Sequence, residues 1–381
     1  MVRRARQVRI EQRIWQVEKS WRVAASDGPL APTLVLFFAG PGTLDGGARF
    51  AEMRARYPAA AILGCTTGGE IADVDVLDGS VVATAIEFER TRLAFAEATI
   101  DAGGDSLVAG RRLGAELPRA GLRGVFVLSD GTRVNGSDLV AGLQSALGPD
   151  ATITGGLAGD GARFASTRVG LNTNPTPGRI VAVGFYGEAV GLGFGSFGGW
   201  DTVGPQRLVT RASGNILYEL DDQSALTLYR KYLGLEADNL PASALLYPLR
   251  IHPPGRPEAA LVRTVIGIDP AGGMIFAGTV PQGHVAQVML GYFDNLVAGA
   301  GRAARRAAQP AAQLAVLVSC IGRKLLLGQQ IADEVDAVKS VLGAACRLTG
   351  FYSYGEIAPL ENSSLCDLHN QTMTITTIAE A

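Results

Sequence analysis

The sequence predicts a mixed α/β (α+β) fold of two related domains, with largely antiparallel sheets flanked by helices and a pocket between or within the domains. The pattern G-x-x-x-x-G-E-I-A occurs twice, at 64–72 and at 350–358. A glycine pair that brackets polar residues needs an unusual backbone path, so its repetition indicates two related halves that face each other. A strand–helix–strand pattern also occurs three times. A pocket between the halves is the expected functional site.

Three segments of roughly 30 residues each have the pattern of a βαβ unit that runs into a glycine-rich turn. Each begins with a short apolar run, continues with a helical segment and ends with a second strand. The predicted strand, helix and strand are 34–38, 47–56 and 60–63 in the first unit, 124–128, 137–147 and 152–154 in the second, and 314–318, 330–342 and 347–349 in the third.

The segments between these units predict mixed rather than all-parallel sheets. Antiparallel strands are expected at 81–88, 92–99, 179–186, 190–198, 261–268 and 274–278, a helix at 225–233, and a closing strand at 372–379. The break between the domains is placed near 215–222. This division predicts an N-terminal extension at 1–28, a first domain at 29–221 and a second domain at 222–381.

Composition argues against several classes of protein. With 47% hydrophobic and 18% charged residues, the chain can bury large cores. A formal net charge of −2 and a pI near 6.0 argue against nucleic acid or an anionic membrane as the main partner. No apolar run approaches the roughly 18 residues of a spanning helix, and the N-terminus lacks the apolar region of a secretory signal. Four cysteines without C-x-x-C spacing are typical of a reduced, cytoplasmic chain.

The sequence contains little evidence for a catalytic site. Cys65 lies in a Gly/Thr-rich turn whose backbone amides could lower a thiol pKa, but nothing in the sequence places one of the three histidines beside it. Glu70 and Glu356, in the two repeated motifs, are expected to accept hydrogen bonds from backbone amides of their turns. The glycine-rich stretch 155–159 follows a strand without opening a helix, so a dinucleotide site is not indicated. We expect no enzymatic activity, and a Cys65-dependent enzyme is the third interpretation.

The three histidines are the candidate ligands. His252 precedes two prolines in a segment that predicts an exposed loop and a solvated side chain. His369 lies just before the closing strand, where it would pin the terminus or serve as the second candidate ligand. His284 is predicted to open an amphipathic helix. The apolar positions of that helix are Val285, Val288, Met289, Tyr292, Phe293 and Leu296.

An imidazole at the start of an apolar helix suits the axial iron ligand of haem. His284 is therefore the candidate metal ligand. The candidate cofactor-binding residues are Met289, Tyr292 and Phe293 for the pocket wall and Arg250 and Arg323 for the propionates. The competing interpretation is that His284 is a helix-terminal residue that bonds its own turn.

Further motifs make the chain similar to the FIST sensory family over nearly its whole length. In the family's order, they are 64–72, 199–201, 215–221, 229–234, 278–283, 319–323, 350–359 and 369–372. The resemblance implies a FIST N-terminal and a FIST C-terminal domain that sense a ligand inside the cell and act on signal-transduction partners. Such sensors are not known as enzymes.

Within that family the chain resembles the NosP-type nitric-oxide sensors, because it is a FIST pair without an attached output domain and because 280–296 is similar to their segment. The resemblance implies haem b (iron protoporphyrin IX) as cofactor, nitric oxide as gaseous ligand, and a partner histidine kinase or cyclic-di-GMP enzyme. Nitric oxide would weaken the bond from iron to His284, and the released helix would alter a partner surface. The alternative is a non-haem FIST sensor for an amino acid or similar metabolite. A homodimer is compatible with both interpretations.

Overall fold

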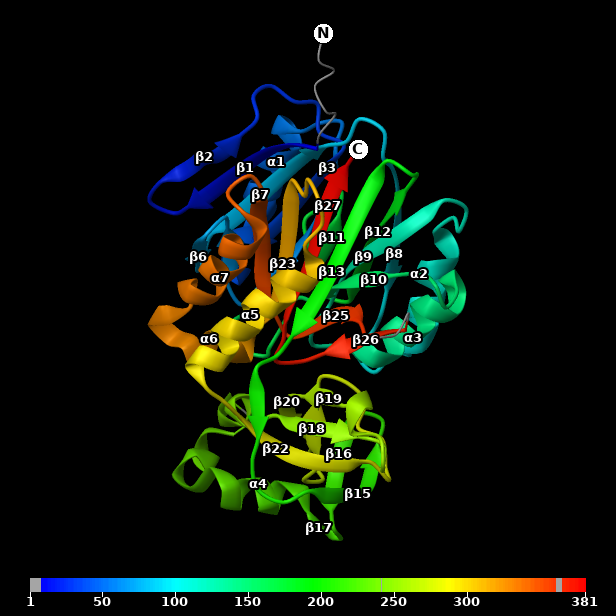
Figure 1. Cartoon of the computed structure of the whole chain (residues 1–381), viewed down its shortest axis with the longest axis vertical. Helices are drawn as coiled ribbons and strands as arrows, with labels where there is room; N and C mark the ends of the chain where they lie inside the picture. Colours follow the sequence, from blue (N-terminus) through cyan, green and yellow to red (C-terminus); the bar gives the residue numbers. More distant parts are fainter. Residues whose placement is uncertain (1–7, 241, 361–364) are drawn as a thin grey trace.

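The computed structural model describes residues 8–240, 242–360 and 365–381. Figure 1 shows a large body with three β-sheets, and a smaller lobe below it. We call them the three-sheet body and the small lobe. The chain leaves the body after β13 (Val190–Phe197), builds the small lobe with 200–291, and returns to the body at α5 (Phe293–Ala307). Among the described helices, none has the length and apolar character needed to cross a membrane.

Each sheet of the three-sheet body has six strands and contains one parallel pair. The first sheet has the order β11 (Val169–Leu171), β4 (Ala61–Thr66), β3 (Leu34–Ala39), β7 (Val81–Glu87), β1 (Arg9–Gln16), β2 (Ser20–Ser26). The second has the order β26 (Cys366–His369), β25 (Gly355–Pro359), β10 (Ile153–Leu157), β9 (Leu122–Ser129), β12 (Arg179–Tyr186), β8 (Arg92–Thr99). The third has the order β13, β27 (Met373–Glu380), β23 (Leu314–Cys320), β24 (Arg347–Ser353), β5 (Glu70–Ala72), β6 (Asp75–Leu77).

The three predicted strand–helix–strand units are confirmed, and each provides the parallel pair of one sheet. In each unit the second strand runs through a glycine-rich turn into a strand of a neighbouring sheet, since β5 pairs with β24, β11 with β4, and β25 with β10. The turns contact one another. Gly68 N donates to Tyr352 O (2.7 Å) and Gly159 N donates to Thr66 O (3.0 Å). The repeat is therefore threefold in space rather than twofold, and strand exchange joins the sheets into one body.

Helices cover the outer faces of the sheets (Figure 1). They are α1 (Ala48–Arg56) on the first sheet, α2 (Ser106–Glu116) and α3 (Gly136–Leu147) on the second, and α5, α6 (Ile321–Leu327) and α7 (Ala332–Leu342) on the third. Short 3-10 helices lie at Pro41–Gly47, Gly234–Asn239, Ala242–Leu246, Pro257–Ala259 and Gly328–Gln330. Local sequence sets the helix starts, because the side chains of Asp105 and Asn135 accept hydrogen bonds from the first-turn amides of α2 and α3.

The small lobe contains a nine-stranded sheet of short strands. Along its main path lie β19 (Leu261–Arg263), β18 (Leu249–His252), β22 (Val285–Gly291), β15 (Arg207–Ser213), β16 (Ile216–Leu220), β21 (Met274–Phe276) and β20 (Val265–Ile268), with β14 (Trp200–Thr202) on β22 and β17 (Gln223–Ser224) on β16. The helix α4 (Ala225–Leu233) has the predicted bounds, and Ser224 caps it by accepting from Thr227 N (3.3 Å). Tyr229 of α4 is fully buried in the lobe's own core.

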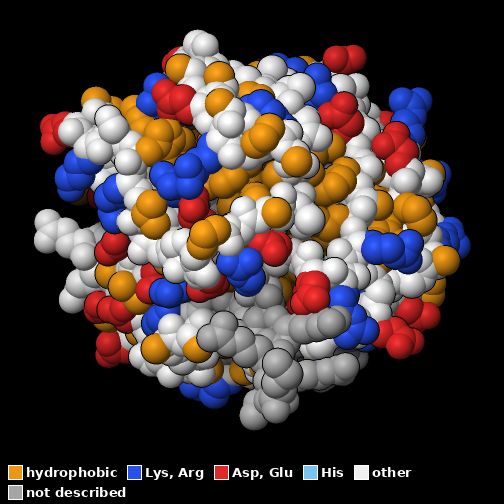
Figure 2. Space-filling model, turned by 90° about the horizontal axis from the view of Figure 1, so that it is seen from above, with side chains coloured by type: hydrophobic (Ala, Val, Ile, Leu, Met, Phe, Trp, Pro, Cys, Tyr) orange, Lys and Arg blue, Asp and Glu red, His pale blue; other side chains and the backbone are white. Residues whose placement is uncertain are grey.

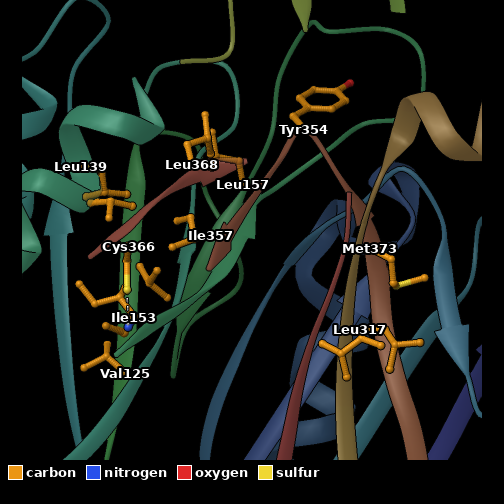
Figure 3. Close-up of a cluster of buried hydrophobic side chains, with 14 of the residues drawn as sticks. Val125, Leu139, Ile153, Leu157, Leu317, Tyr354, Ile357, Cys366, Leu368 and Met373 are labelled. Carbon is orange, nitrogen blue, oxygen red and sulfur yellow. Dashed lines mark hydrogen bonds between the residues drawn. The ribbon is translucent and has the colours of Figure 1, made fainter. Parts of the chain in front are cut away.

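A hydrophobic core joins residues that lie far apart in the sequence. Figure 3 shows Val125 and Ile153, from the adjacent strands β9 and β10, near Leu139 of α3 and Cys366 and Leu368 of β26. Ile153 N donates to Cys366 Sγ (3.3 Å). Because full burial of an aliphatic side chain stabilises a protein by about 1.5–3 kcal/mol, this cluster holds β26 against the second sheet.

Figure 2 shows the end of the molecule opposite the small lobe, where hydrophobic side chains lie in groups among charged ones. The C-terminal strand ends here. The Glu380 carboxylate accepts hydrogen bonds from the backbone amides of Glu89 (2.7 Å), Arg90 (2.9 Å) and Thr91 (2.6 Å). Burial raises the pKa of Glu380, but these bonds and the Thr91 hydroxyl lower it below its ordinary value. The carboxylate therefore fastens β27 to the loop after β7.

Three predictions made from the sequence are wrong. The described part of 1–28 is not a separate extension, because β1 pairs with β7 and β2 pairs with β1. The predicted helix that begins at His284 is the strand β22, and a helix begins only at Phe293. His252 ends β18 with a buried side chain and does not lie in an exposed loop. The predicted boundary at 221/222 lies between β16 and β17, so both predicted domains contribute strands to the small lobe.

Candidate functional site

A cleft of about 1380 Å³ separates the three-sheet body from the small lobe. β13 and α5 form its wall on the body, and the segments around β18, β19 and β22 form its wall on the lobe. Residues that flank β25 and β26 close a third side. Concave sites between structural units are common places for small-molecule ligands.

The body wall carries an aromatic ring with two arginines above it. The guanidinium groups of Arg302 and Arg306 lie 5.1 Å and 5.3 Å from the centre of the Phe197 ring. Arg306 Nη1 also donates to Ser196 O (3.1 Å). Both arginines are on α5, one helical turn apart, which places them on the same helix face. Contact with an aromatic face orients a guanidinium group at little cost in hydration.

The lobe wall combines two further arginines with apolar side chains. Arg250 of β18 is half-buried and donates to Pro257 O. Arg256 is exposed and forms an ion pair with Glu258 (3.3 Å). Met289 of β22 is buried and faces the same cleft, where it packs with Trp200. The lobe wall is therefore cationic at its edge and apolar behind it.

The third side contributes polar groups. His369, at the end of β26, is half-buried, and its Nε2 lies 3.2 Å from Ala358 O. Because a carbonyl oxygen only accepts, Nε2 carries the hydrogen and Nδ1 the lone pair of the neutral ring. Burial lowers the pKa of His369 below its ordinary value, although the neighbouring Asp367 opposes that decrease, which favours the neutral ring. The buried Asn370 side chain accepts from Thr264 N (3.2 Å), which joins this side to the lobe.

Two family models match the chain. The FIST N domain matches residues 33–223 and the FIST C domain matches residues 225–359. The chain belongs to the FIST family. It is therefore a small-molecule sensing protein of signal transduction. The cleft of this FIST protein is lined from both matched segments, by Phe197 and Trp200 from the first and by Arg250, Met289 and Arg302 from the second.

No curated protein matches this FIST chain. Among solved structures, the crystal structure of a cyanuric acid hydrolase from A. caulinodans is similar, with a TM-score of 0.33 and 10% sequence identity over 92% of this chain and 90% of that one. An overlap this loose supports no inference about activity.

In this FIST protein, His284 does not line the cleft. His284 lies in the turn before β22, where its backbone N donates to Pro281 O (3.3 Å) and its carbonyl accepts from Val209 N (2.8 Å). Burial, followed by the neighbouring His252, lowers the pKa of its ring. His252 Nδ1 lies 2.8 Å from Pro253 O, and its Nε2 is buried without a hydrogen-bond partner among the described residues. The two histidines thus sit beside each other, outside the cleft lining.

The remaining predicted site residues divide into two groups. Met289 and Arg250 line the cleft, together with the second candidate ligand His369. Tyr292 and Phe293 do not line it: Tyr292 is exposed at the start of α5, and Phe293 packs beside Trp200 and Leu296. These two positions lie away from the lining because 284–296 is not one continuous helix: β22 ends at Gly291 and α5 begins at Phe293.

Arg323 is unsuited to bind a propionate, because its donors are already engaged. The fully buried guanidinium contacts Glu334 through Nε (3.0 Å) and Nη2 (2.9 Å). Its remaining N–H groups donate hydrogen bonds to the carbonyl oxygens of Gly198, Leu296 and Gln371. An arginine has five N–H donors, and these contacts use them. Arg323 therefore supports the segments beside the cleft, with its N–H donors engaged by the protein.

Cys65 has the environment of a structural thiol. It is fully buried in β4, and burial together with the nearby Glu70 raises its pKa well above the ordinary value. A thiol nucleophile needs a depressed pKa and access to substrate. Among the described residues, no group of three or more His, Cys, Asp and Glu side chains could hold a metal ion.

The two repeated glutamates share one hydrogen-bond pattern. Glu70 accepts from the hydroxyl groups of Thr67 and Ser80 and from Ser80 N (2.9 Å). Glu356 accepts from the hydroxyl groups of Ser353 and Thr372 and from Thr372 N (3.1 Å). In each case one donor lies three residues earlier in the motif, and the other lies immediately before a returning strand, β7 or β27. The predicted donors, backbone amides of the glutamates' own turns, are wrong: the one backbone amide that donates to each carboxyl group belongs to Ser80 or Thr372, outside the motif, and hydroxyl groups provide the other bonds.

Because these two carboxyl groups are buried, we expect the free energy of unfolding to depend on pH. Burial raises the pKa of Glu70 to about 7 and that of Glu356 to about 8, from an ordinary 4.5. Above pH 4.5 the unfolded chain is ionised at these positions, while the folded chain keeps its proton up to about pH 7 on Glu70 and up to about pH 8 on Glu356. The free energy of unfolding therefore falls as pH rises, by about 1.4 kcal/mol per pH unit and group inside that window.

Glu356→Gln isolates this effect, because the amide cannot ionise. Chemical denaturation between pH 5 and 9 is expected to show the variant gaining stability relative to wild type as pH rises, with the gain levelling off above pH 8. The exposed Glu116→Gln variant is the control. A wild-type to Glu356→Gln difference that stays constant over this range would contradict the expectation.

Sequence reasoning missed most of the cleft. Phe194, Phe197, Trp200, Arg302 and Arg306 were not singled out as ligand-binding residues, yet all line it. One signal was present, because Arg302 and Arg306 repeat at a helical i, i+4 spacing. Their pairing with Phe197, more than 100 positions earlier, depends on the packing of α5 against β13.

Proposed function

We propose that this FIST protein is a sensor whose small-molecule ligand binds in the cleft between the three-sheet body and the small lobe. The observation that carries the proposal is a cleft of about 1380 Å³ with apolar walls and several arginines, lined from both FIST segments. A ligand that contacts both walls affects their relative arrangement, which is a direct route from binding to a signal. The partner, a histidine kinase or cyclic-di-GMP enzyme, remains a prediction.

An anionic metabolite suits the cleft best. Of the residues that the structure describes, four arginines and two carboxylates, Asp201 and Glu258, line the cleft, in a chain whose formal net charge is −2. Guanidinium groups bind carboxylates and phosphates through paired, charge-assisted hydrogen bonds. An amino acid or a related organic acid offers such a group together with an apolar part for Phe197 and Met289.

Haem is the second candidate ligand, and His369 favours it. His369, Met289 and Arg250 line one cleft and fit haem as an iron ligand, an apolar contact and a propionate partner. Since Nε2 of His369 donates to Ala358 O, Nδ1 is the nitrogen that would hold iron. Bound haem would supply an iron that takes up nitric oxide. His284 lacks this setting, because it lies outside the cleft lining.

A cleft-filling variant tests the site itself. Ala298 is an exposed residue of α5 that lines the cleft, so Ala298→Trp is expected to abolish the rise in melting temperature caused by a ligand. For a ligand at about 100 times its Kd, that rise corresponds to about 2.7 kcal/mol. Ala115→Trp, on the exposed face of α2, is the matched control. A metabolite screen in which both variants respond like wild type would place the ligand elsewhere.

Hemin titration separates the two candidates. If haem binds in the cleft, the purified protein gains a Soret band that shifts on adding nitric oxide. We expect His369→Ala to weaken hemin binding by about tenfold or more, equivalent to about 1.4 kcal/mol, while His252→Ala and His284→Ala bind as wild type does. A protein that stays colourless with hemin but responds to organic acids would reject the haem candidate alone.

A further inference from the structure

The arginines of the cleft lie on opposite walls. Arg302 and Arg306 belong to α5 of the three-sheet body, whereas Arg250 and Arg256 belong to the small lobe. A ligand with one anionic group needs only one of these pairs. The distribution over both walls points instead to a ligand that presents negative charge in two directions.

Two of these guanidinium groups are suited to bind a ligand. Arg256 already has a carboxylate partner in Glu258 (3.3 Å). Arg250 and Arg302 have no carboxylate within salt-bridge distance among the described residues. Arg250 donates to Pro257 O, and Arg302 lies over the Phe197 ring. An arginine without an anionic partner that is held in place by neutral groups retains donors for an incoming anion.

Apolar side chains line the same cleft as these two arginines. Phe194 and Phe197 come from β13, Trp200 from β14, and Leu261 and Met289 from the lobe. The Trp200 indole nitrogen donates to Gln371 O (3.0 Å), so its polar atom is satisfied and its ring is left to pack. Such walls favour the burial of a flat or aromatic body.

Resting on the proposed function, we infer that the ligand is an elongated dianion with an apolar middle. Arg302 on α5 binds one anionic group and Arg250 on β18 binds the other, while the middle of the ligand packs between Phe197 and Met289. Each end makes charge-assisted hydrogen bonds to a different wall of the cleft. Aromatic dicarboxylates have this chemistry and serve as probes.

The test compares aromatic dicarboxylates with matched monocarboxylates. The probes are terephthalate with benzoate, naphthalene-2,6-dicarboxylate with 2-naphthoate, and biphenyl-4,4′-dicarboxylate with biphenyl-4-carboxylate, measured by calorimetry with the full chain at pH 7. We expect at least one dicarboxylate to bind about tenfold or more tightly than its monocarboxylate. Higher salt should weaken the dicarboxylate more, because two ion pairs are screened instead of one.

Variants on each wall then show whether both ends are bound. Arg250→Gln and Arg302→Gln should each weaken the preferred dicarboxylate by about tenfold and reduce its advantage over the monocarboxylate. Arg112→Gln, an exposed substitution on α2 away from the cleft, is the matched control and should bind as wild type does. Circular dichroism confirms that each variant is folded.

The outcomes separate this inference from the proposed function. If a monocarboxylate binds as tightly as its dicarboxylate, and Ala298→Trp blocks both, the cleft is a ligand site but the dianion inference is wrong. A dicarboxylate that is insensitive to either arginine also overturns the inference. If no dicarboxylate binds, the inference is also wrong. The metabolite and hemin titrations still test whether the cleft is a ligand site.

Discussion

Arg323→Met is expected to destabilise the protein by about 3–5 kcal/mol, because it leaves Glu334 as an uncompensated buried charge. Both side chains of this ion pair are fully buried, with Arg323 Nη2 and Glu334 Oε2 2.9 Å apart. The substitution also removes donors from Gly198 O and Leu296 O, where the chain leaves the body and where α5 begins. The measurement is the free energy of unfolding from urea denaturation at pH 7.

A second substitution shows that the buried charge is the cause. Adding Glu334→Gln to Arg323→Met removes the orphaned charge but keeps a side chain that can hydrogen-bond to Ser319 and Tyr352. The double variant should therefore be more stable than Arg323→Met alone. If the double variant is the less stable of the two, the loss arises from packing around Arg323 and the charge argument is wrong.

Gly350→Ala is expected to cost about 3 kcal/mol or more, because the added methyl group has no room. A Cβ at Gly350 would lie 2.0 Å from Leu317 O of the parallel neighbour β23, and a backbone atom cannot move without distorting the sheet. The equivalent positions of the other two units have the same crowding. A Cβ would lie 2.2 Å from Phe37 O at Gly64 and 1.9 Å from Val127 O at Gly155.

Gly301→Ala is the matched control for this prediction. Gly301 is a buried glycine of α5, but a Cβ there would meet only ordinary contacts, the nearest at 3.6 Å to the Arg305 side chain. Replacing a helical glycine by alanine stabilises a helix by about 0.5–1 kcal/mol. Thermal unfolding should therefore place Gly301→Ala at or above wild type and Gly350→Ala well below it. Equal melting temperatures would contradict the steric argument.

Local sequence patterns predicted most of the elements. The strands β8 and β12 and the helix α4 have the predicted bounds, and the three strand–helix–strand units lie where their apolar runs indicate. The exception at 284–296 has a physical cause. Its apolar residues fit a helical spacing, but 285–291 also fits a strand. Pairing with β14, β15 and β18 decided in favour of the strand.

The candidate site was harder to predict than the fold. Of the candidate ligands, the structure places His369, Met289 and Arg250 at the cleft and leaves His284, Tyr292, Phe293 and Arg323 outside its lining. Arg302 and Arg323 both lie on helices, α5 and α6. Only the packing shows that one is fully buried against Glu334 while the other is exposed over Phe197.

The sequence by itself determined the family, the repeated glycine–glutamate turns and the elements around them, because motif spacing and apolar periodicity act over a few neighbouring residues. Tertiary structure alone decided that the repeat is threefold, that its strands exchange between sheets, and that Arg250 and Arg302 face one cleft. These outcomes depend on contacts between residues tens to hundreds of positions apart. Short-range preferences do not specify such contacts, since they form only when whole sheets pack together.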